Sequence, residues 1–213
     1  MDLITLQEQI NYIVDLLMPY KKQILAIGIG NHEHKHINKF NPTIEMCRRL
    51  GDNYGAVTYI LQMMNKGKLM HRFFLTHGNG GMPKGAKDPI QRRANQAAWI
   101  KRRLEETGIP AIFSCFGHIH HLQVVPPSID SEVHLTVKSG KLKQIKRSTT
   151  NQAADHIPPE ARWYATTGSF LKLYSEGDNI SYSEIKMYPP PKLGYIKVTV
   201  KEGCVTDVQE VRI

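Results

Sequence analysis

Three short apolar runs in this chain each lead into a polar block that contains histidine. The blocks are Gly30-Asn31-His32-Glu33, Thr76-His77-Gly78 and Phe116-Gly117-His118-Ile119-His120. Short apolar runs bounded by glycine and polar residues are typical of buried β-strands. In open α/β sheets, the loops that leave the carboxyl ends of the strands converge at one edge, where ligands bind. The pattern therefore predicts an α/β fold with a histidine-rich site at a sheet edge.

Helical and extended segments alternate along the rest of the chain. An amphipathic helix is expected to begin at a capping box of Thr5 and Glu8 and to stop at Pro19. Two further helices are predicted, at about 42–50 and 88–107. Strands are expected at 24–27, 57–63, 69–75, 111–116, 133–137 and 163–166, with a last hairpin turning near 202–203. With 213 residues, the chain fits one domain better than two.

The net charge and the cysteines indicate the kind of partner and the cellular compartment to expect. The net charge of +9 favours a polyanionic partner, and a phosphate-rich ligand or nucleic acid would each satisfy it. Cys47, Cys115 and Cys204 lie far apart with no C-x-x-C pair, which favours buried, reduced thiols. The sequence shows neither a signal-peptide pattern nor an apolar run long enough to span a membrane. We therefore expect a cytoplasmic protein without membrane association.

In this order, the three histidine blocks resemble the last three motifs of the calcineurin-like metallophosphoesterase family, G-N-H-[DE], H and G-H-x-H. The family's two earlier motifs, D-x-H and G-D-x-x-D, do not occur in this sequence. The resemblance implies a sandwich of two mixed β-sheets flanked by helices and lacking its N-terminal strands. Residues 1–213 would then form a single, N-terminally truncated domain. The implied activity is hydrolysis of a phosphomonoester or phosphodiester substrate by a metal-bound hydroxide.

The resemblance also assigns metal ligands, residue by residue. Asn31, His77 and His118 resemble the ligands of one divalent ion, and His120 resembles a ligand of a second. Imidazole suits zinc or iron, whereas the carbonyl oxygen of asparagine suits harder ions such as manganese. The remaining ligands of the family come from D-x-H and G-D-x-x-D, so at most one ion would be well ligated here. Hydrolysis by this chain alone is therefore expected to be impaired.

Four other residues have expected roles around these ions. His32 resembles the family histidine that binds no metal but stabilises the transition state or protonates the leaving oxygen. Glu33 is expected outside the metal ligands, where it orients the loop or a neighbouring imidazole. The backbone amides of Asn79 and Gly80 are candidate phosphate contacts, with a plain surface loop as the alternative.

The sequence leaves two alternatives to an active phosphoesterase. One is a non-catalytic binding protein that keeps the fold and uses the residual pocket or a basic face for its partner. The other is half of a split phosphoesterase, completed by a separate N-terminal polypeptide that carries the absent motifs. An unpaired sheet edge would also favour self-association. The histidines outside the assigned set are expected in solvent: His34, His36, His71, His121, His134 and His156.

Overall fold

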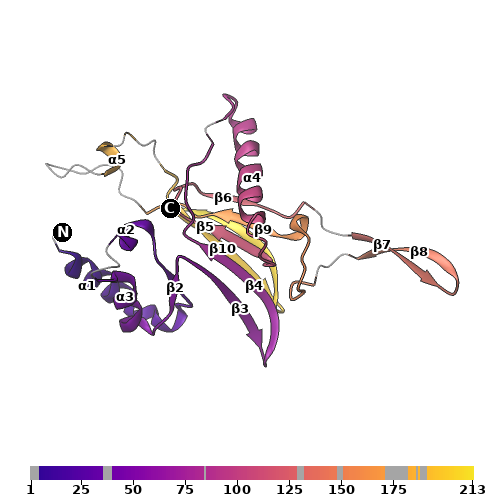
Figure 1. Ribbon diagram of the computed structural model, residues 1–213, viewed down its shortest axis with the longest axis horizontal. Helices are drawn as coiled ribbons and strands as arrows, with labels where there is room; N and C mark the ends of the chain where they lie inside the picture. Colours follow the sequence, from indigo (N-terminus) through magenta and orange to yellow (C-terminus); the bar gives the residue numbers. More distant parts are fainter. Residues whose placement is uncertain are drawn as a thin grey trace. The chain divides into compact units, whose positions relative to one another are not determined.

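The computed structural model describes residues 5–35, 40–83, 85–128, 132–147, 151–170, 182–185, 187 and 191–213. These residues form a mixed structure of helices and strands, so the predicted α/β class is confirmed (Figure 1). The chain divides into two compact units. Unit 1 comprises Met1–Tyr59 and Thr76–Asn79, and unit 2 comprises Ile60–Leu75 and Gly80–Ile213.

Helix α1 (Leu6–Leu17) opens unit 1 with the predicted capping box. The Thr5 hydroxyl accepts a hydrogen bond from the Glu8 backbone N–H at 3.2 Å, and the Glu8 carboxylate accepts one from the Thr5 N–H at 2.8 Å. Pro19 follows the end of α1, but it does not end helical structure. It lies in the first turn of a 3₁₀ helix, η1 (Met18–Gln23), where its missing N–H leaves no hydrogen bond unmade.

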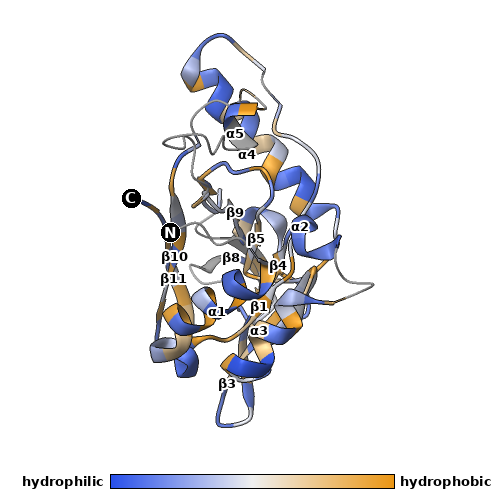
Figure 2. Ribbon diagram, turned by 90° about the vertical axis from the view of Figure 1, so that its left-hand side faces the viewer, coloured by the Kyte–Doolittle hydropathy of each residue, from blue (hydrophilic) through white to orange (hydrophobic). Residues whose placement is uncertain are grey.

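Helix α3 (Pro42–Leu50) also has the predicted boundaries. The Asn41 side chain accepts a hydrogen bond from the Ile44 N–H at 3.0 Å, and Gly51 ends the helix in the left-handed conformation. Figure 2 shows hydrophilic and hydrophobic residues mixed along α1 and α3, as expected of amphipathic helices that pack together. Their apolar stripes form the core of unit 1, whose buried members are Ile10, Val14 and Leu50.

Strands β1 (Ile27–Gly28) and β2 (Tyr54–Ala56) form a short parallel pair in unit 1. β1 begins at Ile27, later than the predicted start at residue 24. A Cβ atom on Gly28 would lie 3.0 Å from the Tyr59 ring, and one on Gly55 would lie 2.7 Å from it. The two strands therefore use glycine where the ring packs directly on their backbone.

Unit 2 is built on a mixed five-stranded sheet. β5 pairs in parallel with β9 and β6 pairs antiparallel with β9. The two-residue turn Lys66–Gly67 joins β3 to β4 with positive φ at both residues, the geometry of the predicted tight hairpin. The strand order is β3 (Thr58–Asn65), β4 (Lys68–Thr76), β5 (Phe113–Phe116), β9 (Trp163–Thr166), β6 (Gln123–Val125).

Helix α4 (Pro89–Glu105) covers one face of this sheet (Figure 1). Asp88 caps it, since its carboxylate accepts a hydrogen bond from the Gln91 N–H at 2.7 Å. The start at Asp88-Pro89 is as predicted. The buried residues at this interface come from α4, from β4, β5 and β9, and from the short segment that precedes β5: Phe74, Ile100, Leu104, Ala111, Phe116 and Tyr164.

An antiparallel hairpin of β10 (Gly194–Lys201) and β11 (Cys204–Arg212) packs against the opposite face. Its turn lies at Glu202–Gly203, as predicted, and both residues have positive φ. Neighbouring strand residues contribute to opposite faces, because side chains alternate along a strand. The buried residues on this side include Phe113, Cys115, Ala165, Val205 and Val208.

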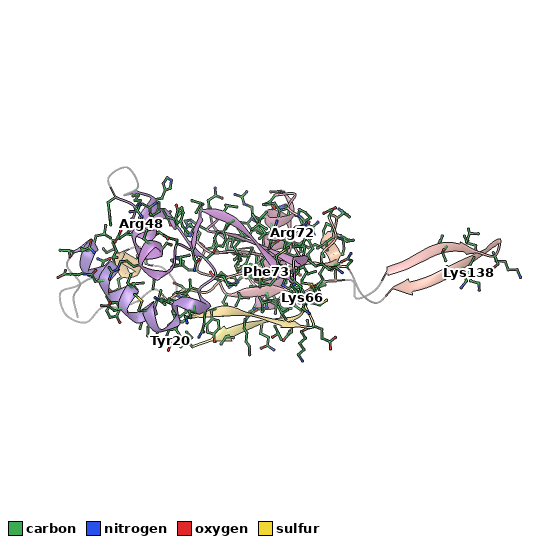
Figure 3. The ribbon with its side chains drawn as sticks, turned by 90° about the horizontal axis from the view of Figure 1, so that it is seen from below. Tyr20, Arg48, Lys66, Arg72, Phe73 and Lys138 are labelled. Carbon is green, nitrogen blue, oxygen red and sulfur yellow. The ribbon has the colours of Figure 1, made fainter. Side chains whose placement is uncertain are left out.

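A second hairpin, β7 (Glu132–Lys138) with β8 (Lys141–Arg147), is a separate two-stranded sheet. Leu135, Val137 and Leu142 share one face of it and are exposed. Lys138 lies near its turn (Figure 3). The other short elements are η2 (Pro159–Ala161), α2 (Asn31–His34) and α5 (Tyr182–Ile185). No helix among the described residues is both long and apolar enough to cross a membrane.

The predicted environments of Cys204 and His71 are wrong. Cys47 and Cys115 are buried, but Cys204 is exposed at the first position of β11, next to the turn. His71, expected in solvent, is 2% exposed. Its Nδ1 lies 2.9 Å from the Gly203 carbonyl oxygen and its ring lies against Phe73. His71 is buried because it alternates in phase with Phe73 on the face of β4 that the β10–β11 hairpin covers.

Candidate metal and phosphate site

Two of the predicted metal ligands lie together in unit 1. Asn31 is the first residue of α2, which follows β1, and His77 follows β4. The Asn31 Oδ1 atom is 2.9 Å from the His77 Nε2 atom, although the two residues are 46 positions apart in sequence. The structure therefore brings an amide oxygen and an imidazole nitrogen to one point.

Glu33 lies beside this pair. Its carboxylate accepts a hydrogen bond from the Gly30 backbone N–H at 3.0 Å. A Cβ atom on Gly30 would lie 2.7 Å from the Glu33 Oε2 atom and 3.2 Å from the His77 Cε1 atom. Glycine is needed here because the carboxylate and the imidazole both approach its backbone. Glu33 thus holds the loop from which Asn31 projects, and its predicted role beside a metal remains a prediction.

The loop that carries His77 is held by hydrogen bonds within unit 1. The His77 N–H donates to the Val57 carbonyl oxygen at 2.8 Å. The Thr76 hydroxyl accepts a hydrogen bond from the Gly78 N–H at 3.2 Å and lies 2.8 Å from the Thr58 hydroxyl. These contacts fix the backbone on both sides of His77 and therefore the point from which its side chain leaves the chain.

The remaining predicted residues of this region are exposed. His32 lies on α2 between Asn31 and Glu33. Asn79 is the last residue of unit 1, and Gly80, with a φ of 83°, has open space where a Cβ would lie. The transition-state role of His32 and the phosphate contacts at Asn79 and Gly80 remain predictions.

His118 and His120 belong to unit 2, in the loop after β5. Their φ angles are 60° and 52°, in the left-handed region. Residues other than glycine enter this region uncommonly, although histidine does so more often than most. Such conformations cost free energy and cluster at functional sites. The backbone of this loop is therefore unusual at both histidines, and their assignment as metal ligands remains a prediction.

His121, the next residue, is not the surface histidine that was expected. It is half-buried, and its Nε2 atom lies 3.1 Å from the Gln123 Oε1 atom. Burial lowers the pKa of His121, and the positive charges of Lys192 and Arg93 lower it further. The Gln123 hydrogen bond and the Glu210 charge oppose this, but the net effect is downward.

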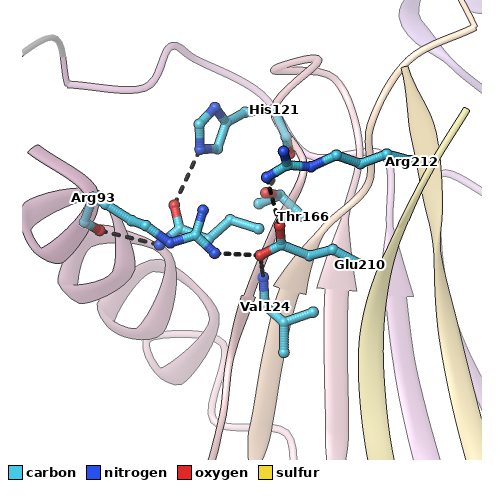
Figure 4. A network of polar contacts seen from close by, with 7 residues as sticks. Arg93, His121, Val124, Thr166, Glu210 and Arg212 are labelled. Atoms are coloured by element: carbon cyan, nitrogen blue, oxygen red, sulfur yellow. Dashed lines mark hydrogen bonds and ion pairs between the residues drawn. The ribbon is translucent and has the colours of Figure 1, made fainter. Parts of the chain in front are cut away.

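A charged cluster around Glu210 was not predicted from the sequence (Figure 4). The Glu210 carboxylate forms an ion pair with Arg93 of α4 and accepts a hydrogen bond from the Val124 N–H at 3.1 Å. Burial raises the pKa of Glu210, but these hydrogen bonds and the neighbouring cations outweigh it, so the pKa is lowered. One signal was available, because Glu210 and Arg212 are two positions apart in a strand and share a face.

The other histidines give a mixed result. His34 and His156 are exposed, as predicted. His36 and the side chain of His134 lie outside the residues that the structure describes. Together with the burial of His71 and His121, this shows that a histidine away from the three blocks has no uniform environment in this chain.

The Asn31–His77 contact is a hydrogen bond in this structure, and its length is also compatible with a shared metal ion. Two atoms bound to one ion at about 2.1 Å and at a right angle lie about 3 Å apart, close to the observed spacing. Within the described part of the chain, no three His, Cys, Asp or Glu side chains gather as a metal site. Comparison of the chain with protein-family models, with curated proteins and with solved structures finds no match.

Proposed function

We propose that this protein is a metal-dependent phosphoesterase of the calcineurin-like type, acting on a phosphomonoester or phosphodiester. The observation that carries the proposal is the 2.9 Å approach of Asn31 Oδ1 to His77 Nε2. The resemblance assigns these two atoms to one ion, and they come from two of the histidine blocks.

The chain's own residues would divide the work as follows. Asn31 and His77 would hold one ion. The resemblance assigns His118 to that same ion and His120 to a second one. A bound divalent ion supplies positive charge for the phosphoryl oxygens and lowers the pKa of a coordinated water. His32, exposed beside Asn31, would stabilise the negative charge on the phosphoryl oxygens in the transition state or donate a proton to the leaving oxygen. Glu33 would keep Asn31 in place through the Gly30 N–H.

The fold of unit 2 supports the same proposal at a coarser level. A mixed five-stranded sheet carries α4 on one face and the β10–β11 hairpin on the other. The resemblance implies two mixed sheets flanked by helices, and this layering of a mixed sheet, a second strand pair and a helix is in line with that arrangement. The β5 strand of this sheet leads directly into His118 and His120.

Metal binding and hydrolysis test the proposal on the full chain. Metal content and manganese affinity should be measured for the wild type and for His77→Ala, Asn31→Ala and His118→Ala, together with turnover of bis-p-nitrophenyl phosphate. Each substitution should weaken metal binding at least about tenfold, because even residues outside the direct ligands have effects of that size. His34→Ala is the matched control, since His34 lies on the same helical turn and is exposed.

The outcomes separate the candidate functions. Turnover and metal affinity that are unchanged in His77→Ala would overturn the metal-site assignment. Metal binding without any turnover would favour a non-catalytic binding protein. Because the sequence lacks the two carboxylate motifs, slow turnover that rises on adding a polypeptide with those motifs would favour the split enzyme.

A further inference from the structure

The cluster around Glu210 has an excess of positive charge. Arg93 comes from α4, Lys192 from the segment before β10, and Arg212 from β11. One guanidinium lies at each oxygen of the carboxylate (Figure 4). Arg93 forms its ion pair with Oε1, and the Arg212 Nη2 atom lies 3.7 Å from Oε2. With three cations and one carboxylate, two positive charges remain uncompensated within the cluster.

Glu210 is mostly buried and cannot satisfy all the donors of the neighbouring cations. Its side chain is only 15% exposed, and its carboxylate accepts a hydrogen bond from the Val124 N–H and pairs with Arg93. The Arg212 side chain is 62% exposed and that of Arg93 is 47% exposed. Each guanidinium has five N–H donors, so a single carboxylate cannot satisfy both. Both guanidinium groups therefore keep donors that Glu210 does not take, on side chains that are partly exposed.

The positive charges of the cluster affect the pKa of Lys192. Its pKa is lowered, first by partial burial and then by the charges of Arg212 and Arg93, which outweigh the attraction of Glu210. Like charges that are held together by the fold are relieved when an anion binds. Arginine pairs also match phosphate geometry, since one guanidinium can donate two parallel hydrogen bonds.

The cluster adjoins the histidine loop of unit 2. His121, which follows His120 directly in the chain, has its Nε2 atom 3.1 Å from the Gln123 Oε1 atom, and the Gln123 side chain donates a hydrogen bond to the Arg93 carbonyl oxygen at 3.0 Å. The Thr166 hydroxyl donates a hydrogen bond to the His121 carbonyl oxygen and ties this loop to β9. A group bound by the cations would therefore lie beside the loop that carries His118 and His120.

We propose that Arg93, Lys192 and Arg212 form a phosphate-binding site, with Glu210 holding the two guanidinium groups in position. If the proposed phosphoesterase function holds, this site takes a phosphate group of the substrate that is not hydrolysed. The substrate class would then be a phosphate ester with at least two phosphate groups, as in a nucleotide chain. Such a site is also in line with the net charge of +9, which favours a polyanionic partner.

Phosphate binding by the metal-free full chain tests the site independently of catalysis. Calorimetric titration with inorganic phosphate in the presence of EDTA should show binding by the wild type. Arg212→Gln and Lys192→Gln should each weaken it about tenfold, as expected for one charged hydrogen-bond donor. Lys197→Gln, an equal charge change at an exposed position of β10, should leave it unchanged. Binding that is absent, or equally weakened by all three substitutions, would overturn the site.

A second measurement links the site to substrate. Deoxythymidine 3′-phosphate 5′-(p-nitrophenyl phosphate) carries an extra phosphate, and deoxythymidine 5′-(p-nitrophenyl phosphate) does not. Arg212→Gln should raise KM for the first ester only and leave kcat of both near the wild-type value. Equal KM changes for both esters would contradict a role in binding a second phosphate. If neither ester is turned over but phosphate still binds, the phosphoesterase function fails and the anion site stands.

Discussion

The two late hairpins, β7–β8 and β10–β11, have the same local design and different environments. Each turns through a residue followed by glycine, with both φ angles positive: 55° and 70° at Ser139–Gly140, and 51° and 77° at Glu202–Gly203. Val205 and Val208 of β11 are 5% exposed, whereas Val137 of β7 is 68% exposed. Turn chemistry and alternation thus specify a hairpin, but only the surrounding chain decides whether its apolar face is buried.

Truncating one valine in each hairpin should give the largest difference. Val208→Ala should lower the free energy of unfolding by about 2–3 kcal/mol, because it removes buried methyl groups and leaves a cavity. Val137→Ala should change it by no more than about 0.5 kcal/mol, since the side chain is exposed. Urea denaturation of the two variants measures this. Equal effects would mean that β7–β8 is covered in solution.

The turn glycines should differ less. Gly140→Ala should cost about 1 kcal/mol, the strain of a left-handed backbone with a Cβ, because nothing else lies near that position. Gly203→Ala should cost somewhat more, at most about 2 kcal/mol, since the terminal methyl group of Met70 must also move away from the new Cβ. Hydrogen exchange of the strand amides, together with denaturation, would report both costs. A Gly140 variant as destabilised as the Gly203 variant would contradict the difference in packing.

Acid should weaken the β10–β11 side of the molecule through Glu210. Because the folded-state pKa of Glu210 lies below its unfolded value of about 4.3, its contribution is present above that value. The contribution is lost as pH falls through the folded pKa. Glu210→Gln should cost about 1 kcal/mol at pH 7 and should flatten the stability profile below pH 5. Identical wild-type and variant profiles from urea melts at pH 7 and pH 3 would refute this.

Thiol labelling should show that β11 has one open face, without changing stability at all. Cys204 is exposed, so Ellman's reagent should modify it in the folded protein. Cys115 is buried, and burial raises its pKa to about 12, so it should react only on unfolding. Cys47 is buried too, and burial and the Asp52 charge raise its pKa. Rapid loss of two or more thiols in the native state would show that the interior opens readily.

The local features of the fold were predictable from sequence because each rests on a few neighbouring residues. The Thr5–Glu8 capping box, the Asn41 cap and the Lys66–Gly67 turn are of this kind. Burial of a strand residue could be predicted only from the alternation of side chains along the whole strand. His71 alternates in phase with Phe73, and that alternation places it in the core.

The candidate site divides in the same way. Asn31 and His77 were recognisable because each follows a strand and stands in a characteristic block. Arg93, Lys192, Glu210 and Arg212 could not be recognised, because α4, the segment before β10, and β11 come together only through tertiary packing. Apart from the strand face that Glu210 and Arg212 share, no local pattern distinguishes these four residues from the other charged residues of the chain.

The left-handed backbone at His118 and His120 costs folding stability at both residues. Glycine at either position would relieve about 1 kcal/mol of strain, so selection for a sturdier fold alone would remove both imidazoles. Thermal melts of His118→Gly and His120→Gly would show whether that relief is realised. A gain in melting temperature would mark this loop as a place where the protein gives up stability to present a particular side chain.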